Sequence, residues 1–202
     1  LLVGLTATPE RMDGKDLRPD FGNRISAEIR LPQALQAGLL TPFQYLCISD
    51  DTDLSDDSLW SGQKYNIERL ADKLCAKTRA QLIVDALHKY LADEYTCRAL
   101  CFCVNKRHAD FMAEQLRLYG FNAQSLTSDT TSDERKQLAK DLREGTLHYL
   151  CVVDIFNEGV DIPEVDTVLF LRPTESLTIF LQQLGRGLRL SAGKTELTVL
   201  DF

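Results

Sequence analysis

The chain has 202 residues, of which 44% are hydrophobic and 26% are charged, and these proportions are typical of a globular protein rather than a low-complexity or disordered one. Its 23 Lys and Arg residues against 30 Asp and Glu residues give a formal net charge of −7, so bulk charge does not indicate nucleic-acid binding, and any such contact requires a local basic patch. No apolar run approaches the roughly 18 residues that span a bilayer, so we expect no membrane partner.

The first third of the chain combines short apolar segments with polar loops. Residues 1–5 are apolar and predict a strand, whereas the charged residues 10–23 predict a loop or linker. A proline in the first turn and a glycine at the end predict a short helix over residues 32–37, and residues 43–48 predict a strand. Five aspartates follow within residues 49–58. They lack the ligand order of a calcium-binding loop, so we interpret them as a solvated acidic loop.

After residue 65, helical and strand patterns alternate regularly. Helices are predicted where apolar residues recur at helical spacing, and strands where short apolar runs are nearly continuous, as burial on two sides requires. This alternation predicts βαβ units and an α/β fold, in which helices cover both faces of a mostly parallel sheet. The predicted elements are a helix over 78–92, a strand over 97–104, a helix around 109–119, a strand over 123–126, a helix from the capping box at 131 to the glycine at 145, strands over 148–153 and 167–171, a helix over 176–184 and a strand over 197–202.

Cysteine and histidine form no recognisable metal-binding pattern. Even the closest set of cysteines, Cys97, Cys101 and Cys103, falls inside one predicted strand, with no loop to fold ligands inward. The three histidines share no ligand spacing and are interpreted as surface or half-buried residues. We therefore predict buried, reduced thiols, no metal site and a cytoplasmic location. The chain opens without the basic flank of a signal peptide and begins and ends in predicted strands, so we also expect a piece of a longer protein.

Candidate functional residues lie in the segments that follow the predicted strands, because open parallel sheets bind ligands beyond the carboxyl ends of their strands. Residues 182–189 read Gln-Gln-Leu-Gly-Arg-Gly-Leu-Arg and place Arg186 and Arg189 three positions apart beside two glycines. Glycine allows close approach of a ligand, and the planar guanidinium suits phosphate oxygens. An ordinary helix end with two solvent-facing arginines is the alternative. Residues 154–161 place carboxylates around Gly159. A carboxylate here could accept a hydrogen bond from a ribose hydroxyl, or the segment could simply form a turn.

Taken in order, these segments resemble motifs III to VI of superfamily 2 helicases. They are Thr6-Ala-Thr-Pro9, Ala99 to Asn105, Asp154 to Asp161 and the Gln-x-x-Gly-Arg-x-x-Arg box at 182–189. Two runs, 4–14 and 185–189, are most similar to the type III restriction enzyme and DEAD-DEAH-like branch of DNA helicases. The resemblance covers nearly the whole chain and implies a RecA-like second helicase lobe of the P-loop NTPase type.

The resemblance also implies how the chain is divided and what it lacks. Residues 1–22 would end the first RecA-like lobe and begin the linker, residues 23–72 would form a linker with a short helix, a strand and the acidic loop, and residues 73–202 would form the second lobe. The Gly-x-x-x-x-Gly-Lys-[Ser/Thr] phosphate loop and the acidic metal-binding box do not occur in the sequence. ATP and Mg²⁺ would therefore be bound mainly by the first lobe, and we expect this chain alone not to hydrolyse ATP.

Roles for individual residues follow from the same resemblance. Arg189 resembles the arginine finger that meets charge developing on the γ-phosphate, and Arg186 resembles its neighbour on the phosphates or a carboxylate. The position before Asp154 is Val153 instead of the frequent Thr, which moves the expected phosphate-backbone contacts to other strand ends. The remaining candidates are Gly159, Asp161 and Gln182 for ATP, Asn105, Lys106, Thr127 and Ser128 for nucleic acid, and Thr6, Ala7 and Thr8 for coupling the two sites.

The implied function is the C-terminal lobe of an ATP-dependent DNA helicase or translocase. Its partners would be DNA, as a single strand or duplex junction, and the first lobe of the same parent chain. We expect the apolar face of the helix over 176–184 (Leu177, Phe180, Leu181, Leu184) to bury against the sheet and to hold Arg189 at the carboxyl edge. Both arginines are expected to be exposed or paired with a carboxylate such as Asp161 or Glu158. The alternatives are a non-catalytic α/β module that binds nucleic acid or protein, and a small-molecule enzyme that uses Asp154 and Asp161.

Overall fold

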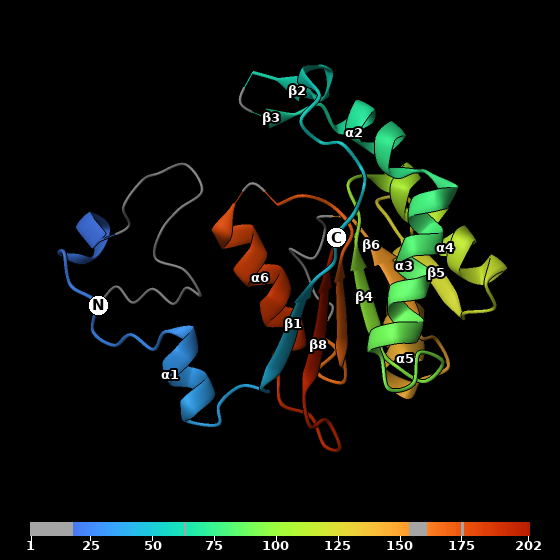
Figure 1. Ribbon diagram of the computed structural model, residues 1–202. Coiled ribbons are helices and arrows are strands. Elements are labelled where there is room, and N and C mark those ends of the chain that lie inside the picture. Colours follow the sequence, from blue (N-terminus) through green and yellow to red (C-terminus); the bar gives the residue numbers. More distant parts are fainter. Residues whose placement is uncertain (1–17, 63, 154–160, 175) are drawn as a thin grey trace.

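The structure is a computed structural model, and it describes residues 18–62, 64–153, 161–174 and 176–202. Its main feature is a sheet of six parallel strands in the order β1-β8-β7-β4-β6-β5, with helices on both faces (Figure 1). This arrangement confirms the predicted fold class. The strands are β1 (Phe43–Cys47), β4 (Ala99–Phe102), β5 (Ala123–Leu126), β6 (Tyr149–Val152), β7 (Thr167–Phe170) and β8 (Leu197–Asp201).

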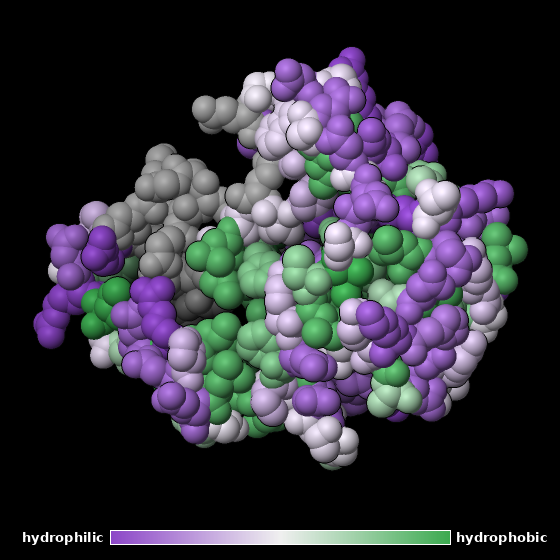
Figure 2. Space-filling view, in the orientation of Figure 1, coloured by the Kyte–Doolittle hydropathy of each residue, from purple (hydrophilic) through white to green (hydrophobic). Residues whose placement is uncertain are grey.

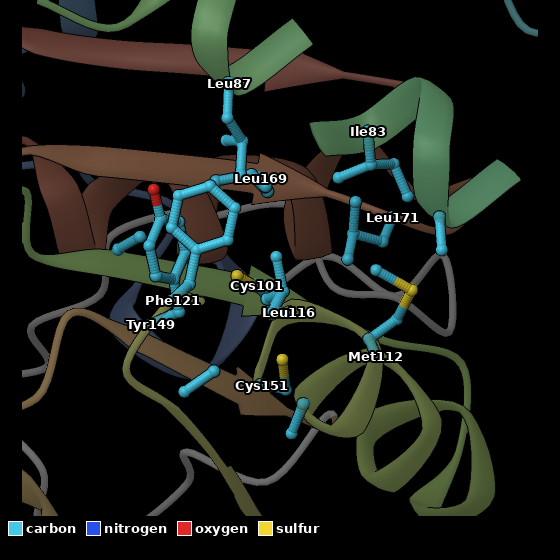
Figure 3. Close-up of a cluster of buried hydrophobic side chains, with 14 of the residues drawn as sticks. Ile83, Leu87, Cys101, Met112, Leu116, Phe121, Tyr149, Cys151, Leu169 and Leu171 are labelled. Atoms are coloured by element: carbon cyan, nitrogen blue, oxygen red, sulfur yellow. The ribbon is translucent and has the colours of Figure 1, made fainter. Parts of the chain in front are cut away.

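The strands bury side chains on both faces of the sheet. Successive residues of a strand point to opposite faces, so in β4 Ala99 and Cys101 join one core cluster, while Leu100 and Phe102 join the other. Figure 3 shows the first cluster, in which Cys101 lies among aromatic and aliphatic side chains such as Phe121. Burial on both faces explains why the strands read as continuous apolar runs.

Four long helices form the outer layers. Helices α3 (Lys77–Tyr90) and α4 (Lys106–Leu118) contribute to the first cluster, and α5 (Ser132–Glu144) and α6 (Leu177–Gly187) contribute to the second. The predicted limits of α5 are confirmed, because the Thr131 side chain accepts a hydrogen bond from the Glu134 amide and Gly145 ends the helix in the left-handed region at φ 76°.

The segment before α3 is more closely tied to the sheet than a linker would be. Strand β1 pairs in parallel with β8, so a strand that the sequence analysis assigned to the linker is an edge strand of the sheet. The acidic loop is also anchored, since Asp50 pairs at 2.5 Å with the buried guanidinium of Arg79, which in turn donates to the Leu171 carbonyl at 3.2 Å. The short elements here are η1 (Arg18–Phe21), α1 (Leu31–Gln36), η2 (Asp57–Leu59), the antiparallel pair β2 (Trp60–Ser61) and β3 (Lys64–Tyr65), and α2 (Ile67–Leu74). Helix α2 was not among the predicted elements.

Two further expectations about side chains are wrong. Only part of the α6 apolar face is buried: Leu184 lies in the core, but Leu177 is 72% exposed, and Figure 2 shows hydrophobic residues at the surface over this helix. The helix continues three residues beyond the predicted end, to Gly187, and its buried residues (Gln183, Leu184 and Gly187) lie in its second half. His108 is completely buried instead of half-exposed: its Nδ1 accepts a hydrogen bond from the Val104 amide at 3.3 Å, and its buried Nε2 has no partner in the described part of the chain.

Among the residues that the structure describes, none of the helices combines the length and apolar character that crossing a bilayer requires. The same residues contain no group of three or more His, Cys, Asp or Glu side chains arranged to hold a metal ion. Cys97, Cys101, Cys103 and Cys151 are buried and unpaired, as predicted, and burial raises the pKa of Cys97 to about 12.

Candidate functional site

The structure brings together two of the predicted site residues, Arg189 and Asp161. Arg189 comes two residues after the end of α6, and its guanidinium donates to the carboxylate of Asp161, which lies in the segment leading into β7. The side chains are 37% and 69% exposed, respectively. The expectation that a local carboxylate neutralises the arginine is therefore confirmed for this pair.

The main chain of Arg189 is fixed although its side chain reaches the surface. Its carbonyl oxygen accepts hydrogen bonds from the Thr41 hydroxyl at 2.8 Å and from the Lys194 ammonium at 3.0 Å. The Thr41 amide donates to the neighbouring Leu188 carbonyl at 2.8 Å. The guanidinium thus extends from a backbone that is held by residues from two other segments of the chain.

This pair lies at the amino edge of the sheet, and the prediction that it lies at the carboxyl edge is wrong. Thr41 precedes β1, Lys194 precedes β8 and Asp161 precedes β7. A helix that connects two neighbouring parallel strands must run back against them, so α6 starts beyond the carboxyl end of β7 and finishes near the amino end of β8 (Figure 1). A residue at the end of such a helix therefore cannot lie at the carboxyl edge.

Arg186 lies in the last turn of α6 and is half-buried. Burial and the positive charge of Arg189 lower the pKa of Arg186, and Asp161 acts in the opposite direction. The two guanidinium groups repel each other, and an anion bound between them would relieve this repulsion. Gln182, predicted to contact ATP, is exposed on α6, whereas its neighbour Gln183 is buried.

Gly187 has a packing role that the sequence analysis did not predict. Both Gly185 and Gly187 lie within α6, and neither has a positive φ. A Cβ atom at Gly187 would lie 2.6 and 2.8 Å from the two terminal carbons of Leu197 and 3.0 Å from Val168 Cγ2. Gly187 therefore allows the end of α6 to approach the sheet closely, which places the following arginine.

Lys194 is a functional candidate that the sequence analysis missed. Its ammonium donates to three carbonyl oxygens at the end of α6 and before β7. Burial lowers the pKa of Lys194 to about 8. A single lysine after a glycine in a short connection carries no recognisable pattern, so only its long-range contacts identify it.

The residues predicted to contact nucleic acid lie at the opposite, carboxyl edge. Lys106 and Ser128 are exposed, and the Lys106 ammonium pairs with the exposed Asp129 carboxylate. Asn105 caps α4 by accepting a hydrogen bond from the His108 amide at 3.0 Å, and its side-chain amide donates to Glu68 at 3.1 Å.

Thr127 is mainly engaged within its own turn. Its side chain is buried, its amide donates to the Thr130 hydroxyl at 3.0 Å, and its carbonyl accepts from Arg135 at 2.9 Å. Of the four candidates, Lys106 and Ser128 thus offer the most accessible polar groups. Gly159, Thr6, Ala7 and Thr8, together with Asp154 and Glu158, lie outside the described residues.

Comparison with known proteins agrees with this architecture. The family described as "Helicase conserved C-terminal domain" matches residues 51–191. IRC3 of Saccharomyces cerevisiae, which carries the name of an ATP-dependent helicase, is 28% identical over 202 residues, and the ATP-dependent RNA helicase DDX50 of Homo sapiens is 32% identical over 136 residues, or 67% of this chain. The chain spans 29% and 18% of these two relatives, respectively.

A solved structure extends the match to almost the whole chain. A fragment assigned to the HsdR subunit of a type I restriction enzyme from Vibrio vulnificus superposes with a TM-score of 0.74 and 25% identity, covering 98% of this chain and 38% of the other. The six-stranded parallel sheet with flanking helices is thus the RecA-like architecture that the motifs indicated. The chain belongs to the helicase conserved C-terminal domain family and forms the C-terminal lobe of a superfamily 2 helicase.

Proposed function

We propose that this lobe serves an ATP-dependent DNA helicase or translocase by presenting Arg189, with Arg186 beside it, to the phosphates of ATP held mainly by the first lobe. The observation that carries the proposal is the contrast within one residue. The Arg189 backbone is fixed by Thr41 and Lys194, while its guanidinium is at the surface and pairs with the exposed Asp161. A side chain that contacts a ligand held by another lobe needs a fixed backbone and an accessible charged group.

A phosphate group can replace the Asp161 carboxylate as the ion-pair partner of Arg189. An ion pair between exposed side chains contributes about 0–1 kcal/mol, so a polyphosphate with several negative charges can replace the carboxylate. The planar fork of arginine then binds two phosphate oxygens and remains charged at any physiological pH. Positive charge delivered where negative charge develops in the transition state is worth about 10³–10⁵ in rate in comparable phosphoryl-transfer enzymes.

The donor set fits the phosphates rather than the metal. Arg186 and Arg189 are cations, which suit phosphate oxygens, and the described residues contain no group of three or more His, Cys, Asp or Glu side chains that could hold a metal ion. When present, Mg²⁺ would neutralise charge on the phosphates through ligands from the first lobe. The sequence likewise lacks the phosphate loop, and we therefore expect the 202-residue chain alone to show no ATP hydrolysis.

Nucleic acid would contact the carboxyl edge, where Lys106 and Ser128 are accessible. We favour DNA over RNA because the structural match that extends over 98% of the chain comes from a type I restriction enzyme, whereas the match to the RNA helicase DDX50 covers 67%. The −7 net charge is consistent with a protein that contacts a strand along a narrow track rather than through a broad basic surface.

The test is single-stranded-DNA-stimulated ATP hydrolysis by the parent protein with Arg189→Lys and Arg189→Ala. Both changes are expected to lower kcat by about 10² or more with little change in KM, because the interaction forms mainly in the transition state. Lys140→Ala, which removes an exposed cation on α5 paired with Glu144 at 3.9 Å, is the matched control and should leave kcat unchanged. Normal kcat in both Arg189 variants would refute the arginine-finger role.

The same assay separates the alternative function. A non-catalytic binding module would bind single-stranded DNA without any stimulated hydrolysis in the parent protein. Clear hydrolysis by the parent, lost in the Arg189 variants, would exclude that alternative.

A further inference from the structure

The ammonium of Lys194 occupies a site built from main-chain oxygens. It donates to the carbonyls of Gly187 at 2.5 Å, Arg189 at 3.0 Å and Pro163 at 3.1 Å. An ammonium has three N–H donors, so the three carbonyls use its full capacity. Lys194 itself follows Gly193, which adopts φ 80° in the turn before β8, and this turn directs the lysine toward the end of α6.

Through these three contacts, Lys194 links the segment that carries Arg189 to the segment that carries Asp161. The last carbonyls of a helix lack intrahelical partners, and a cation at the helix C-terminus both satisfies them and interacts favourably with the helix dipole. Gly187 is the last residue of α6 and Arg189 follows it by two residues, whereas Pro163 belongs to the segment that contains Asp161. The side chain therefore fixes the arginine's backbone relative to the segment on which its carboxylate partner lies.

We propose that Lys194 is a positioning residue for Arg189, acting through the main chain at the end of α6 rather than through contact with ATP. This inference rests on the proposed function, since it assigns Lys194 to the same catalytic step. Removing the ammonium takes the Lys194 donor from the Gly187 and Pro163 carbonyls, and it leaves the Arg189 carbonyl with one anchor, Thr41, in place of two. A shift of about 1 Å in a charged catalytic group is enough to lower a rate about 10²-fold.

The charges around Lys194 make its role dependent on pH. Burial is the main cause that lowers the pKa of Lys194 to about 8, and Arg189 lowers it further, while Asp166 and Glu164 before β7 raise it. Glu164 also pairs with Arg143 of α5 at 3.7 Å, and the facing residue before β1, Thr41, is uncharged. Above pH 8 the neutral amine retains two N–H donors for three carbonyls, so one anchor is lost.

The test compares kcat and KM of the parent ATPase with Lys194→Met, which keeps the length of the side chain without its charge, and Lys194→Arg, which keeps a charge that is not titrated. Lys194→Met is expected to lower kcat about 10-fold or more and to change KM less than twofold. Lys194→Arg should retain more activity than Lys194→Met. Lys140→Met, on the exposed face of α5, is the matched control and should behave as the unaltered protein.

The pH profile provides a readout that a purely structural role would not change. The unaltered protein should lose activity as pH rises through about 8, whereas Lys194→Arg should not. The residual activity of Arg189→Ala should also lack this decline, because without the guanidinium there is nothing to position. A profile of the unaltered protein that stays flat from pH 7 to 9 would overturn the proposal, even if Lys194→Met fails to fold.

A double variant separates this inference from the proposed function. If Lys194 acts through Arg189, Arg189→Ala with Lys194→Met should be no slower than Arg189→Ala alone. Normal kcat in Lys194→Met together with a defective Arg189→Ala would overturn the role of Lys194 and leave the proposed function standing. Normal kcat in Arg189→Ala would overturn both.

Discussion

Replacing Gly187 by alanine should destabilise the chain, because the end of α6 lies too close to the sheet for a side chain. The new Cβ atom would lie 2.6 and 2.8 Å from the terminal carbons of Leu197 and 3.0 Å from Val168 Cγ2, and both of these residues are fully buried. Forcing an extra carbon into a packed core costs about 1–3 kcal/mol. Alanine gains about 0.5–1 kcal/mol over glycine within a helix. With both ranges taken at their midpoints, the net loss in the free energy of unfolding is about 1 kcal/mol.

Gly185→Ala is the matched control two positions earlier in the same helix. No heavy atom lies within 4 Å of a Cβ at Gly185, and its φ is not positive, so only the helix-propensity gain of about 0.5–1 kcal/mol applies. The two variants should shift the urea midpoint of this chain, followed by circular dichroism, in opposite directions with an unchanged m-value. Equal stability of Gly187→Ala and the unaltered chain would refute the close packing of α6 on the sheet.

Two further predictions concern the carboxyl edge. Burial lowers the pKa of His108 to about 3, so His108 stays neutral in the native state, whereas the unfolded chain binds a proton at this residue below about pH 6.5. The stability that the folded chain gains from the neutral form is complete above pH 6.5 and is lost as the pH falls toward 3. Between pH 7 and 5 the free energy of unfolding, measured with urea, should fall by about 2 kcal/mol more in the unaltered chain than in His108→Asn. The control His88→Asn should show the same pH dependence as the unaltered chain. An equal pH dependence in the unaltered chain and His108→Asn would contradict a neutral buried histidine. In the parent protein, Lys106→Ala should weaken DNA binding similarly on every sequence and lower the slope of log K against log salt by about one, because one phosphate contact releases about one counterion. Asp129→Asn, which frees the Lys106 ammonium, should strengthen binding, and an unchanged salt slope in Lys106→Ala would return Lys106 to an ordinary surface ion pair.

The local pattern of the sequence was sufficient for most of the elements and for the architecture. Strand 123–126 and the helix between Thr131 and Gly145 were predicted correctly, because capping residues and continuous apolar runs are signals that neighbouring residues carry. Helix α2 was not predicted, although its sequence carries a local signal. Asn66 caps it, and Ile67, Leu70, Ala71 and Leu74 recur at the spacing of an amphipathic helix. It has only eight residues, and its buried face packs against Val104, which follows β4.

The candidate site shows the limit of such patterns. The spacing in residues 182–189 singled out Arg186 and Arg189, and the resemblance assigned them a role, but the edge of the sheet at which they lie depends on the path of the whole chain. The contacts that fix Arg189 come from Thr41, 148 positions earlier, and from a lysine whose neighbours in sequence carry no signal. Periodicity records which face of a helix is buried, since that depends on adjacent turns. The carbonyl oxygen that an isolated side chain reaches, by contrast, depends on segments that only folding brings together. In this chain, folding determined both where Arg189 lies and which residues hold its backbone.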